Sequence, residues 1–429
     1  MNRLLIRNGI IVTPDEIFRA DIFIVDETIA QIAPSIEAAG ARVIDATGLH
    51  ILPGLIDPHV HLRDPGATHK EDFTTGTRAA LAGGVTTLLD MPNNPQPTTT
   101  RAALEEKRAL ARAKAVCDYG FFVGATKENE RLEIGDWGAV GVKLYMGATT
   151  GDLLVTDFAS IFRHFRANPL PIVVHAEDNE ALRFFANDPS RTRHSAKRPP
   201  VAAALAVSRA LVLAEETGRR LHIAHLSTAK EIELVKAAKA RGARVSCEVT
   251  PQHLLLSTDD EERLGALGIV NPPLRSPEDV RALWQNLDHC DLVATDHAPH
   301  TLEEKQSAKP SSGMPGLETM LPLLLTAASE KRMALQGIAR LTARNPARVF
   351  RLARKGEIAV GYDADLTFVR LDDEYVLRKP WQTKCNWSPF EGRRARGRIQ
   401  RVFLRGREVM ASGEILVESG YGKETERSK

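Results

Sequence analysis

Short apolar runs alternate with helical patterns through the middle of the chain. Segments with the periodicity of amphipathic helices follow most of the runs, for example at 73–82, 201–217 and 229–241. The runs themselves lie at 54–61, 85–91, 118–124, 141–146, 171–175, 221–226, 244–249 and 291–297. Apolar strands that alternate with helices are typical of a parallel α/β sheet.

Eight strand–helix units in succession predict a (β/α)8 TIM barrel over residues 54–353. A doubly wound open sheet is the alternative arrangement of the same units. No GxGxxG motif follows an early run, which counts against a dinucleotide-binding version of that open sheet.

The two ends of the chain have a different pattern from the middle. At 1–53, short β-branched runs are broken by glycine, proline and acidic turns. The same pattern returns over 354–429, where 356–369 and 399–410 each predict a strand, a turn and a second strand. We therefore expect one small composite β-sandwich domain formed by both termini.

Composition and charge exclude some classes of function. The 429 residues, 43% of them hydrophobic, are enough for a sizeable core, and the net charge of +2 argues neither for nor against a partner. Basic tracts such as 393–398 are too short for a nucleic-acid patch. No apolar run approaches the roughly 20 residues of a membrane span, and the N-terminus has no signal-peptide pattern. Four cysteines without a CxxC pair fit a reducing compartment, so we expect a cytoplasmic protein.

The first apolar run ends in two histidines, His59 and His61, before a break at Asp64-Pro65-Gly66. Alternate residues of a strand share one face, which places the two imidazoles about 7 Å apart along the strand, where both can bind one metal ion. Arg63 is next on that face and suits a carboxylate bound beside the metal. A half-buried strand with two partly exposed histidines is the alternative interpretation.

Other polar side chains lie at the ends of the later strands, where TIM barrels build their active sites. These residues are Asn93, Lys143, His175, His225 and Asp296. Taken singly, each of these histidines would be interpreted as a buried core residue, and the aspartate as the cap of the next helix. Five metal-capable side chains at strand ends, with His59 and His61 among them, together predict a two-metal site.

At these residues the chain resembles the amidohydrolase superfamily and, within it, the dihydroorotases of the long bacterial type. The motifs that carry the resemblance follow one another in family order from about 53 to 320. They are DPHVHLRDPG (57–66), MPNNP (91–95), VKLY (142–145), HAED (175–178), HLST (225–228), EVTPQH (248–253), NPPLR (271–275), ATDHAPH (294–300) and GMPGLET (313–319).

The resemblance implies a ligand set and a modification. His59, His61 and Asp296 would hold one divalent ion, and His175 with His225 the other. A lysine ammonium has no acceptor for a metal, so Lys143 would bridge the ions as a CO2-derived carbamate (N6-carboxylysine), with Asp152 as the alternative bridge. Zinc fits imidazole-rich ligation best, although manganese and cobalt fit the same ligand types.

The resemblance also implies an activity, the reversible hydrolysis of L-dihydroorotate to N-carbamoyl-L-aspartate in de novo pyrimidine biosynthesis. A hydroxide between the metals would attack the ring amide, with Asp296 as general base and then general acid. Arg63, Asn93 and His300 match the family's carboxylate-binding set, and Asn271 matches a residue beside the pyrimidine ring. Asn93 also reads as part of a turn. The loop 147–152 is expected near the substrate.

Several alternatives remain open at this point. Allantoinases and dihydropyrimidinases (hydantoinases) would use the same metals, so the set Arg63, Asn93 and His300 is the discriminating feature. A scaffold subunit for an enzyme of the same pathway is the alternative of another class. His253 is open between a residue that supports a metal ligand, a substrate contact and a structural residue, while His222 and His297 are interpreted as packing or supporting residues. Relatives imply a homodimer and an association with aspartate transcarbamoylase.

Overall fold

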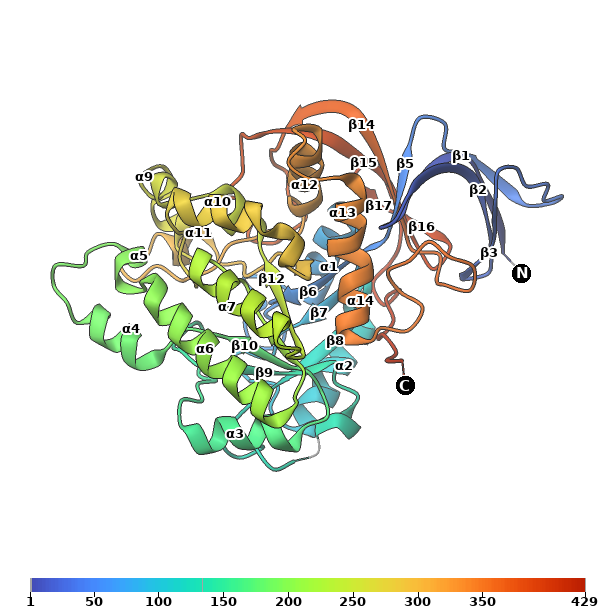
Figure 1. The fold of residues 1–429 in the computed structure, drawn as a ribbon. Helices are drawn as coiled ribbons and strands as arrows, with labels where there is room; N and C mark the ends of the chain where they lie inside the picture. The colour runs from blue at the N-terminus through green and yellow to red at the C-terminus, as the bar shows by residue number, and fades with distance from the viewer. Residues whose placement is uncertain (1, 133, 429) are drawn as a thin grey trace.

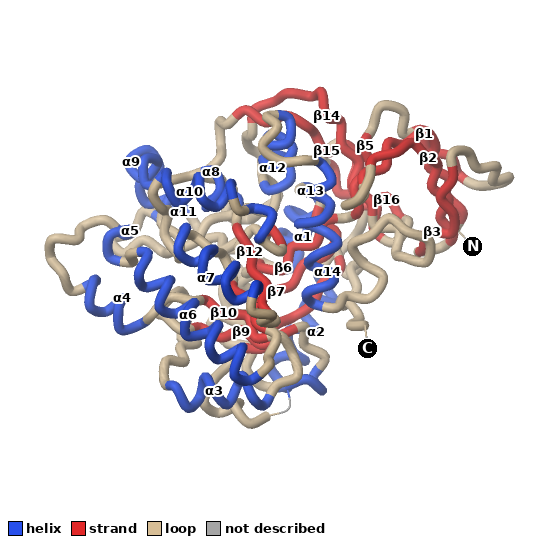
Figure 2. Tube along the Cα trace, in the orientation of Figure 1, coloured by secondary structure: helices blue, strands red, loops and turns tan. Residues whose placement is uncertain are grey.

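The computed structural model describes residues 2–132 and 134–428. Within these residues the strands form one eight-stranded sheet and one nine-stranded sheet. Helices surround the eight-stranded sheet, and the nine-stranded sheet lies to one side of it, next to the N-terminus (Figures 1 and 2).

The eight-stranded sheet is a nearly closed parallel barrel whose strands follow chain order. Its closure is made by the His61 amide, which donates to the His297 carbonyl at 2.8 Å, beside a parallel bridge from Val60 to His297. The TIM-barrel prediction is confirmed, and the open-sheet alternative is wrong. The strands are β6 (Leu55–Val60), β7 (Val85–Asp90), β8 (Asp118–Gly124), β9 (Gly141–Tyr145), β10 (Ile172–His175), β11 (Leu221–Ile223), β12 (Val245–Val249) and β13 (Leu292–Val293).

Local sequence signals explain where the barrel helices begin and end. Asp72 caps the first helix by accepting from the Thr75 amide at 2.8 Å, and Gly218 ends the longest at φ 65°. The three helices predicted from periodicity are confirmed to within one residue. The helices are α1 (Phe73–Ala82), α2 (Arg101–Lys114), α3 (Phe158–Ala167), α4 (Asn179–Ala186), α5 (His194–Lys197), α6 (Pro200–Thr217), α7 (Ala229–Ala240), α8 (Pro251–Leu255), α9 (Glu261–Leu264), α10 (Pro277–Gln285), α11 (Leu302–Lys305), α12 (Met320–Ser329), α13 (Leu335–Ala339) and α14 (Asn345–Phe350).

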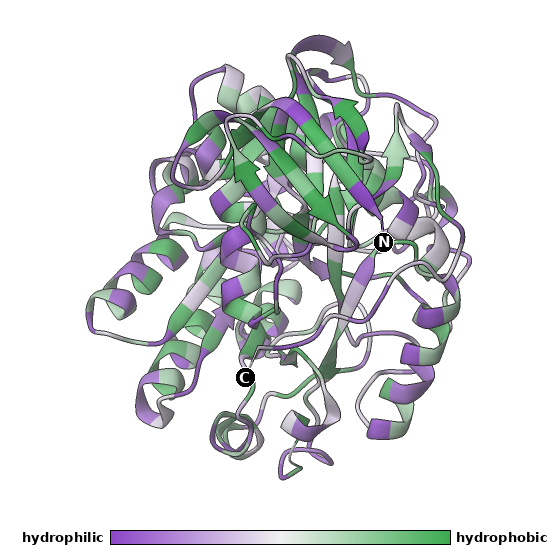
Figure 3. Cartoon of the chain, turned by 90° about the vertical axis from the view of Figure 1, so that its right-hand side faces the viewer, coloured by the Kyte–Doolittle hydropathy of each residue, from purple (hydrophilic) through white to green (hydrophobic). Residues whose placement is uncertain are grey.

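The nine-stranded sheet combines both ends of the chain, as predicted. Its central join is antiparallel pairing of β5 with β14, where Ile51 lies opposite Phe368. Hydrophobic and hydrophilic residues alternate along its strands (Figure 3), and the apolar side packs a core of its own that includes Ile22 and Phe403. The strands are β1 (Arg3–Val12), β2 (Ile17–Val25), β3 (Thr28–Ala33), β4 (Arg42–Asp45), β5 (His50–Pro53), β14 (Leu366–Val376), β15 (Arg394–Leu404), β16 (Arg407–Ala411) and β17 (Glu414–Ile415).

One predicted strand does not form. The segment 356–360 was expected to begin a strand–turn–strand unit, but only its second strand exists, as β14. Gly356 has φ 83°, and a Cβ there would meet the Ala343 carbonyl, so the backbone leaves the strand region. Ile358 still buries its side chain in the core of the β sheet. The pair over 399–410 does form, as β15 and β16.

The last described residues return from the β sheet to the barrel. The Tyr119 amide donates to the Lys423 carbonyl at 3.0 Å, and the Thr425 amide donates to the Tyr119 carbonyl at 2.7 Å. The chain therefore ends along β8, beside α14 (Figure 1). Among the described residues, none of the helices combines the length and hydrophobicity needed to cross a bilayer.

Candidate active site

A cavity of about 370 Å³ opens at the C-terminal ends of the barrel strands. The structure brings nine of the ten predicted site residues to its wall. The tenth, His300, lies behind the wall in contact with Arg63. The nine are His59, His61, Arg63, Asn93, Lys143, His175, His225, Asn271 and Asp296.

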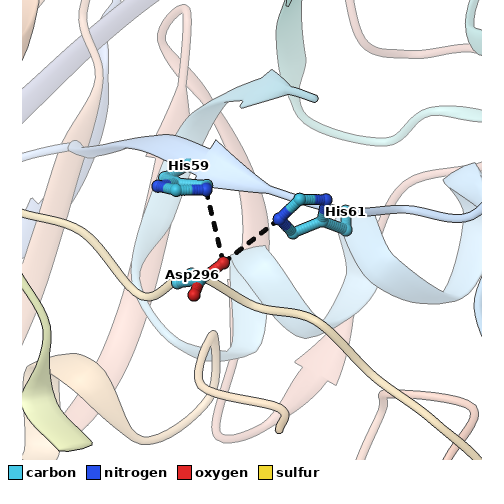
Figure 4. Close-up of side chains that lie close together, drawn as sticks. All are labelled: His59, His61 and Asp296. Atoms are coloured by element: carbon cyan, nitrogen blue, oxygen red, sulfur yellow. Dashed lines mark hydrogen bonds and ion pairs between the residues drawn. The ribbon is translucent and has the colours of Figure 1, made fainter. Parts of the chain in front are cut away.

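His59, His61 and Asp296 form a compact cluster of potential metal ligands. Nε2 of His61 lies 3.1 Å from Asp296 Oδ1, and Nε2 of His59 lies 3.3 Å from the same oxygen. Figure 4 shows both imidazoles directed at this carboxylate from the strand above it. One ligand atom from each residue falls within 4.8 Å of the others, and all three side chains are buried. Two neutral imidazoles and a carboxylate are a donor set that fits a divalent metal.

Backbone geometry at this cluster is unusual for residues other than glycine. Asp296 has φ 49° and Arg63 has φ 62°. Since β6 ends at Val60, Arg63 does not continue the strand as expected. A left-handed turn, rather than strand alternation, places its guanidinium in the cavity. Such conformations cost free energy, and they cluster at functional sites.

A second pair of histidines faces the first. His175 Nδ1 lies 3.0 Å from His225 Nε2, and His225 has φ 39°. Lys143, fully buried on the neighbouring strand β9, has no hydrogen-bond partner for Nζ among the described residues. Burial lowers the pKa of Lys143 to about 8. An unpaired buried amine is costly unless a further group completes the site. Nδ1 of His225 also has no hydrogen-bond partner among the described residues. The buried Lys143 amine and this free imidazole nitrogen make the part of the site around His175 and His225 fit a metal as well.

Two buried carboxylates behind the histidines were given no role from sequence. Glu248 accepts from Nε2 of His222 at 3.0 Å and from Nδ1 of His59, and it accepts from the His225 amide at 3.1 Å. Burial opposes its ionised form, but the two histidines outweigh burial and lower the pKa of Glu248. Carboxylates in this position fix the tautomer and orientation of metal-binding imidazoles. The sequence did contain a signal for Glu248, because it belongs to the motif EVTPQH and is the last but one residue of β12.

Glu177 occupies the equivalent position behind His175. Its Oε2 lies 3.1 Å from His175 Nε2, which directs Nδ1 of that imidazole toward His225. Arg198 pairs with the same carboxylate and also donates to the Ala148 carbonyl at 2.9 Å. This arrangement connects the histidine pair to the loop 147–152, of which Thr149 and Thr150 line the cavity.

Three further histidines support the site or the fold. His222 holds Glu248 from behind. The open question about His253 is answered by its contacts, because it binds the Thr250 hydroxyl at 2.8 Å and the Pro272 carbonyl at 3.1 Å and does not line the cavity. His297 Nδ1 accepts from the Gly316 amide at 3.2 Å, and its Nε2 lies 3.3 Å from Glu71.

The predicted substrate residues are held by a network on one side of the cavity. Arg63 donates to the Pro299 carbonyl at 3.2 Å and to His300 Nε2 at 3.3 Å. Burial, with the positive charges of Arg63 and Lys70, lowers the pKa of His300 to about 3, so its imidazole is neutral and accepts from Arg63. Arg63 is 5% exposed, and no carboxylate of the described residues forms an ion pair with it.

The two asparagines connect this side of the cavity to its loops. Asn93 accepts from His61 Nδ1 at 2.6 Å and donates to the Thr150 carbonyl at 3.0 Å. Asn271 accepts from His194 Nε2 at 2.8 Å and donates to the Thr149 hydroxyl at 3.2 Å. Both amides thus face the cavity while they hold the loop 147–152 over it.

Comparison with known proteins identifies the family of this arrangement. The model of the amidohydrolase family matches residues 50–409. The chain is 43% identical over 367 residues to a dihydroorotase of Halobacterium salinarum, covering 82% of this chain and 85% of that protein. It is 38% identical over 432 residues to an allantoinase of Desulfitobacterium hafniense, covering 96% of each.

Two further similarities concern a longer protein and a solved structure. The multifunctional protein CAD of Squalus acanthias is 43% identical over 378 residues, or 87% of this chain, which spans only 15% of the length of that protein. The L-hydantoinase (dihydropyrimidinase) of Arthrobacter aurescens has the same fold, with a TM-score of 0.95, 32% identity and 100% of both chains covered. Proteins with several different named activities are therefore similar to this chain, in sequence or in both sequence and fold.

Proposed function

The chain belongs to the amidohydrolase family, and within that family we propose that it acts as a dihydroorotase, which interconverts L-dihydroorotate and N-carbamoyl-L-aspartate. Metal-dependent hydrolysis of a cyclic amide is the chemistry that the family and its buried His–His–Asp cluster support.

The observation that carries the proposal is the buried guanidinium of Arg63. It is 5% exposed and lacks a carboxylate partner among the described residues. Asp296, Asp90 and Glu304 act on it only from beyond ion-pair distance. A buried cation without a direct partner is costly, and an arginine fork matches a carboxylate in a bidentate manner. L-dihydroorotate carries a carboxylate on its ring, whereas allantoin, hydantoin and dihydrouracil do not. Arg63 therefore has a counter-ion only with the first of these substrates.

In this proposal the polar residues of the cavity divide between metal and substrate. His59, His61 and Asp296 would hold one ion, His175 and His225 the other, and Lys143 would bridge them as a carbamate. Burial that favours a neutral amine supports this modification, because only the neutral amine attacks CO2, losing a proton as the carbamate forms. Two divalent ions, zinc by ligand type, would supply a Lewis acid and lower the pKa of a bound water.

Asp296 is the residue that we propose moves the proton. Burial raises the pKa of this carboxyl above its ordinary value, which suits a group that must accept a proton and then release it. It would take the proton of the attacking water and deliver it to the ring nitrogen that leaves. Arg63 would bind the substrate carboxylate, with Asn93 and His300 supporting it and Asn271 beside the ring.

A specific observation favours a second candidate, a sister cyclic amidase. The allantoinase relative covers 96% of both chains, and the hydantoinase structure superimposes over the whole chain. An allantoinase or a dihydropyrimidinase would use the same metal residues but would leave Arg63 without a counter-ion. A scaffold subunit is disfavoured because the chain has retained all the predicted metal ligands.

We also propose that the chain acts as a homodimer and associates with aspartate transcarbamoylase. The association is supported by multifunctional relatives that contain a segment matched by this chain, and the homodimer follows from the family resemblance alone. Size-exclusion chromatography with light scattering, with and without that enzyme, tests both points. A monomeric mass that added transcarbamoylase leaves unchanged would contradict them.

The test of function is a substrate panel on zinc-loaded enzyme prepared with bicarbonate. We expect ring opening of L-dihydroorotate, with allantoin, hydantoin and dihydrouracil turned over far more slowly. Preference for one of the uncharged rings would retain the chemistry and reject the role of Arg63. Inactivity on all four with two bound metals, measured by elemental analysis, would favour the scaffold.

A further inference from the structure

Four arginines gather at the end of the barrel opposite the cavity. Arg220 and Arg244 immediately precede β11 and β12, whose residues Leu221 and Val245 are paired in register. The Leu221 amide donates to the Arg244 carbonyl at 3.0 Å, so the two arginines lie at the N-terminal ends of adjacent parallel strands. The residues of the active site lie at the C-terminal ends of the same strands.

Arg351 and Arg427 reach this end of the barrel from the C-terminal third of the chain. Phe350, the last residue of α14, packs its ring 5.5 Å from that of His222 on β11, which places Arg351 below that strand. Arg427 belongs to the final segment, which pairs with Leu352 in an antiparallel bridge. Burial lowers the pKa of Arg220 to about 10, and the charges of Arg351, Arg427 and Arg244 act in the same direction.

This cluster lacks the counter-ions that neighbouring arginines have. Arg354 pairs with Asp363 at 3.0 Å, and Arg344 pairs with Asp15 and Glu357. By contrast, within residues 2–132 and 134–428, none of the four clustered arginines forms an ion pair with a carboxylate. Nε of Arg427 is also buried without a hydrogen-bond partner among these residues. Arg244 and Arg351 are exposed while Arg220 and Arg427 are half-buried, so solvent screens part of their mutual repulsion and an anion among them would offset the rest.

A cavity of about 780 Å³ adjoins the cluster. Of the four clustered arginines Arg351 lines it, beside Tyr362 and Ser428, which supply an aromatic ring and a hydroxyl. Arg348 also lines it but pairs with Glu357, a carboxylate of the same lining. Guanidinium forks bind phosphate oxygens in pairs, and a phosphate carries more charge than a carboxylate, so it compensates several arginines at once. A concave, cationic and partly aromatic site suits a phosphate that carries an organic group.

We propose that Arg220, Arg244, Arg351 and Arg427 form an anion site at the floor of the barrel that binds a phosphate-bearing ligand, with the organic part in the adjoining cavity. The site is separate from the catalytic cavity and does not depend on which cyclic amide the enzyme hydrolyses. It would be occupied by inorganic phosphate or by a mononucleotide, two sources of the same phosphate chemistry.

Isothermal titration calorimetry on the full-length, zinc-loaded protein tests this site with inorganic phosphate and adenosine monophosphate as probes. We expect binding to the native protein and a loss of at least about tenfold in affinity in the double variant Arg220→Gln, Arg351→Gln. The matched control is Arg101→Gln with Arg370→Gln, which removes two exposed arginines without ion pairs from other elements and is expected to bind as the native protein does.

The two probes distinguish the source of the ligand. Equal affinities would indicate a site for phosphate alone, whereas tighter binding of the mononucleotide would assign the cavity to its organic part. Equal affinity of phosphate for native protein and double variant would place the anion elsewhere and overturn the proposal. Absence of binding of both probes up to about 10 mM would overturn it as well. If the double variant does not fold, Arg351→Lys, which retains the charge but loses the fork, is expected to weaken binding.

Discussion

Two of the buried lysines, Lys143 and Lys355, have opposite surroundings. Lys355, after α14, lies 2.7 Å from carboxylate oxygens of Asp118 and Asp365 and 3.0 Å from Asp363. Burial opposes its charge, but these carboxylates outweigh burial and raise the pKa of Lys355. Lys143, at the end of β9, has no partner for its amine among the described residues, and burial lowers its pKa to about 8.

The difference separates a structural position from a functional one. The carboxylates around Lys355 come from β8 of the barrel and from residues before β14 of the β sheet, so this ion cluster connects the two sheets. Two arginines repeat the contrast, since Arg405 pairs with Asp118 while Arg63 in the active-site cavity has no carboxylate partner in the described chain. Lys355 and Arg405 are paired with carboxylates, whereas Lys143 and Arg63 line the active-site cavity without an ion pair among the described residues.

Replacing Lys143 by methionine should have the largest effect, and it should fall on activity alone. Removing the proposed bridge costs several kcal/mol of transition-state stabilisation, so we expect kcat/KM to fall on the order of 10³-fold. The free energy of unfolding of the metal-free protein should stay the same or rise, because an unpaired buried amine is replaced by an apolar side chain. Steady-state assays and urea unfolding measure the two quantities. Strong destabilisation of the metal-free protein would show that Lys143 has a structural partner.

The same substitution at Lys355 should have the opposite result. Lys355→Met leaves three buried carboxylates without their cation, which should lower the free energy of unfolding by about 3 kcal/mol. The activity of the remaining folded protein should be unchanged, since Lys355 is far from the catalytic end of the barrel. Lys309→Met, at an exposed lysine without an ion pair, is the control and should be neutral in urea unfolding. Equal stability of the two variants would contradict the structural assignment.

The contribution of Lys355 should also depend on pH in one direction. Its folded pKa is raised above the ordinary lysine value of 10.5, so its stabilisation is fully present below pH 10.5 and is lost as the pH rises through the higher folded value. The difference in unfolding free energy between native protein and Lys355→Met should therefore be constant from about pH 7 to 9.5 and narrow above about pH 10.5. Urea titrations across this range measure it. A difference that changes between pH 7 and 9 would assign the effect to another group.

Replacing Arg63 by glutamine tests whether this buried guanidinium, which lacks an ion pair among the described residues, binds the substrate carboxylate. We expect kcat/KM for L-dihydroorotate to fall on the order of 10²-fold through loss of a charge-assisted contact with the substrate carboxylate. Slow turnover of dihydrouracil, which has no carboxylate, should be unaffected and serves as the internal control. An equal loss on both substrates would indicate that Arg63 acts on the fold of the site rather than on the substrate.

The smallest expected effect is on the residues that orient the metal ligands. Glu248→Gln retains the shape of the side chain but removes the charge that His59 and His222 share, so zinc affinity should fall by about tenfold. Competition with a chromogenic chelator measures it, and added zinc should restore most of the activity. An unchanged zinc affinity would show that Glu248 only satisfies hydrogen bonds behind the site.

Much of the site could be predicted because strand ends in a barrel meet at one rim. The positions of His59, Lys143, His175 and His225 followed from their places after apolar runs. Glu248 and Glu177 were given no role, because a buried carboxylate behind a histidine has no local pattern that separates it from a strand or cap residue. The strand predicted at 356–360 does not form for a related reason. The backbone of Gly356 packs so closely against the distant Ala343 carbonyl that tertiary packing overrides the local strand propensity.

The sequence by itself determined the order and period of the barrel units, the composite β sheet and the set of polar residues that the barrel assembles. These properties depend on patterns between near neighbours along the chain and on one topology. Only the tertiary structure decided which buried charges have counter-ions, because that depends on side chains brought together from distant segments. It therefore distinguished Lys143 from Lys355 and Arg63 from Arg405. Each pair consists of the same residue type, and its two members differ in the charges that surround them.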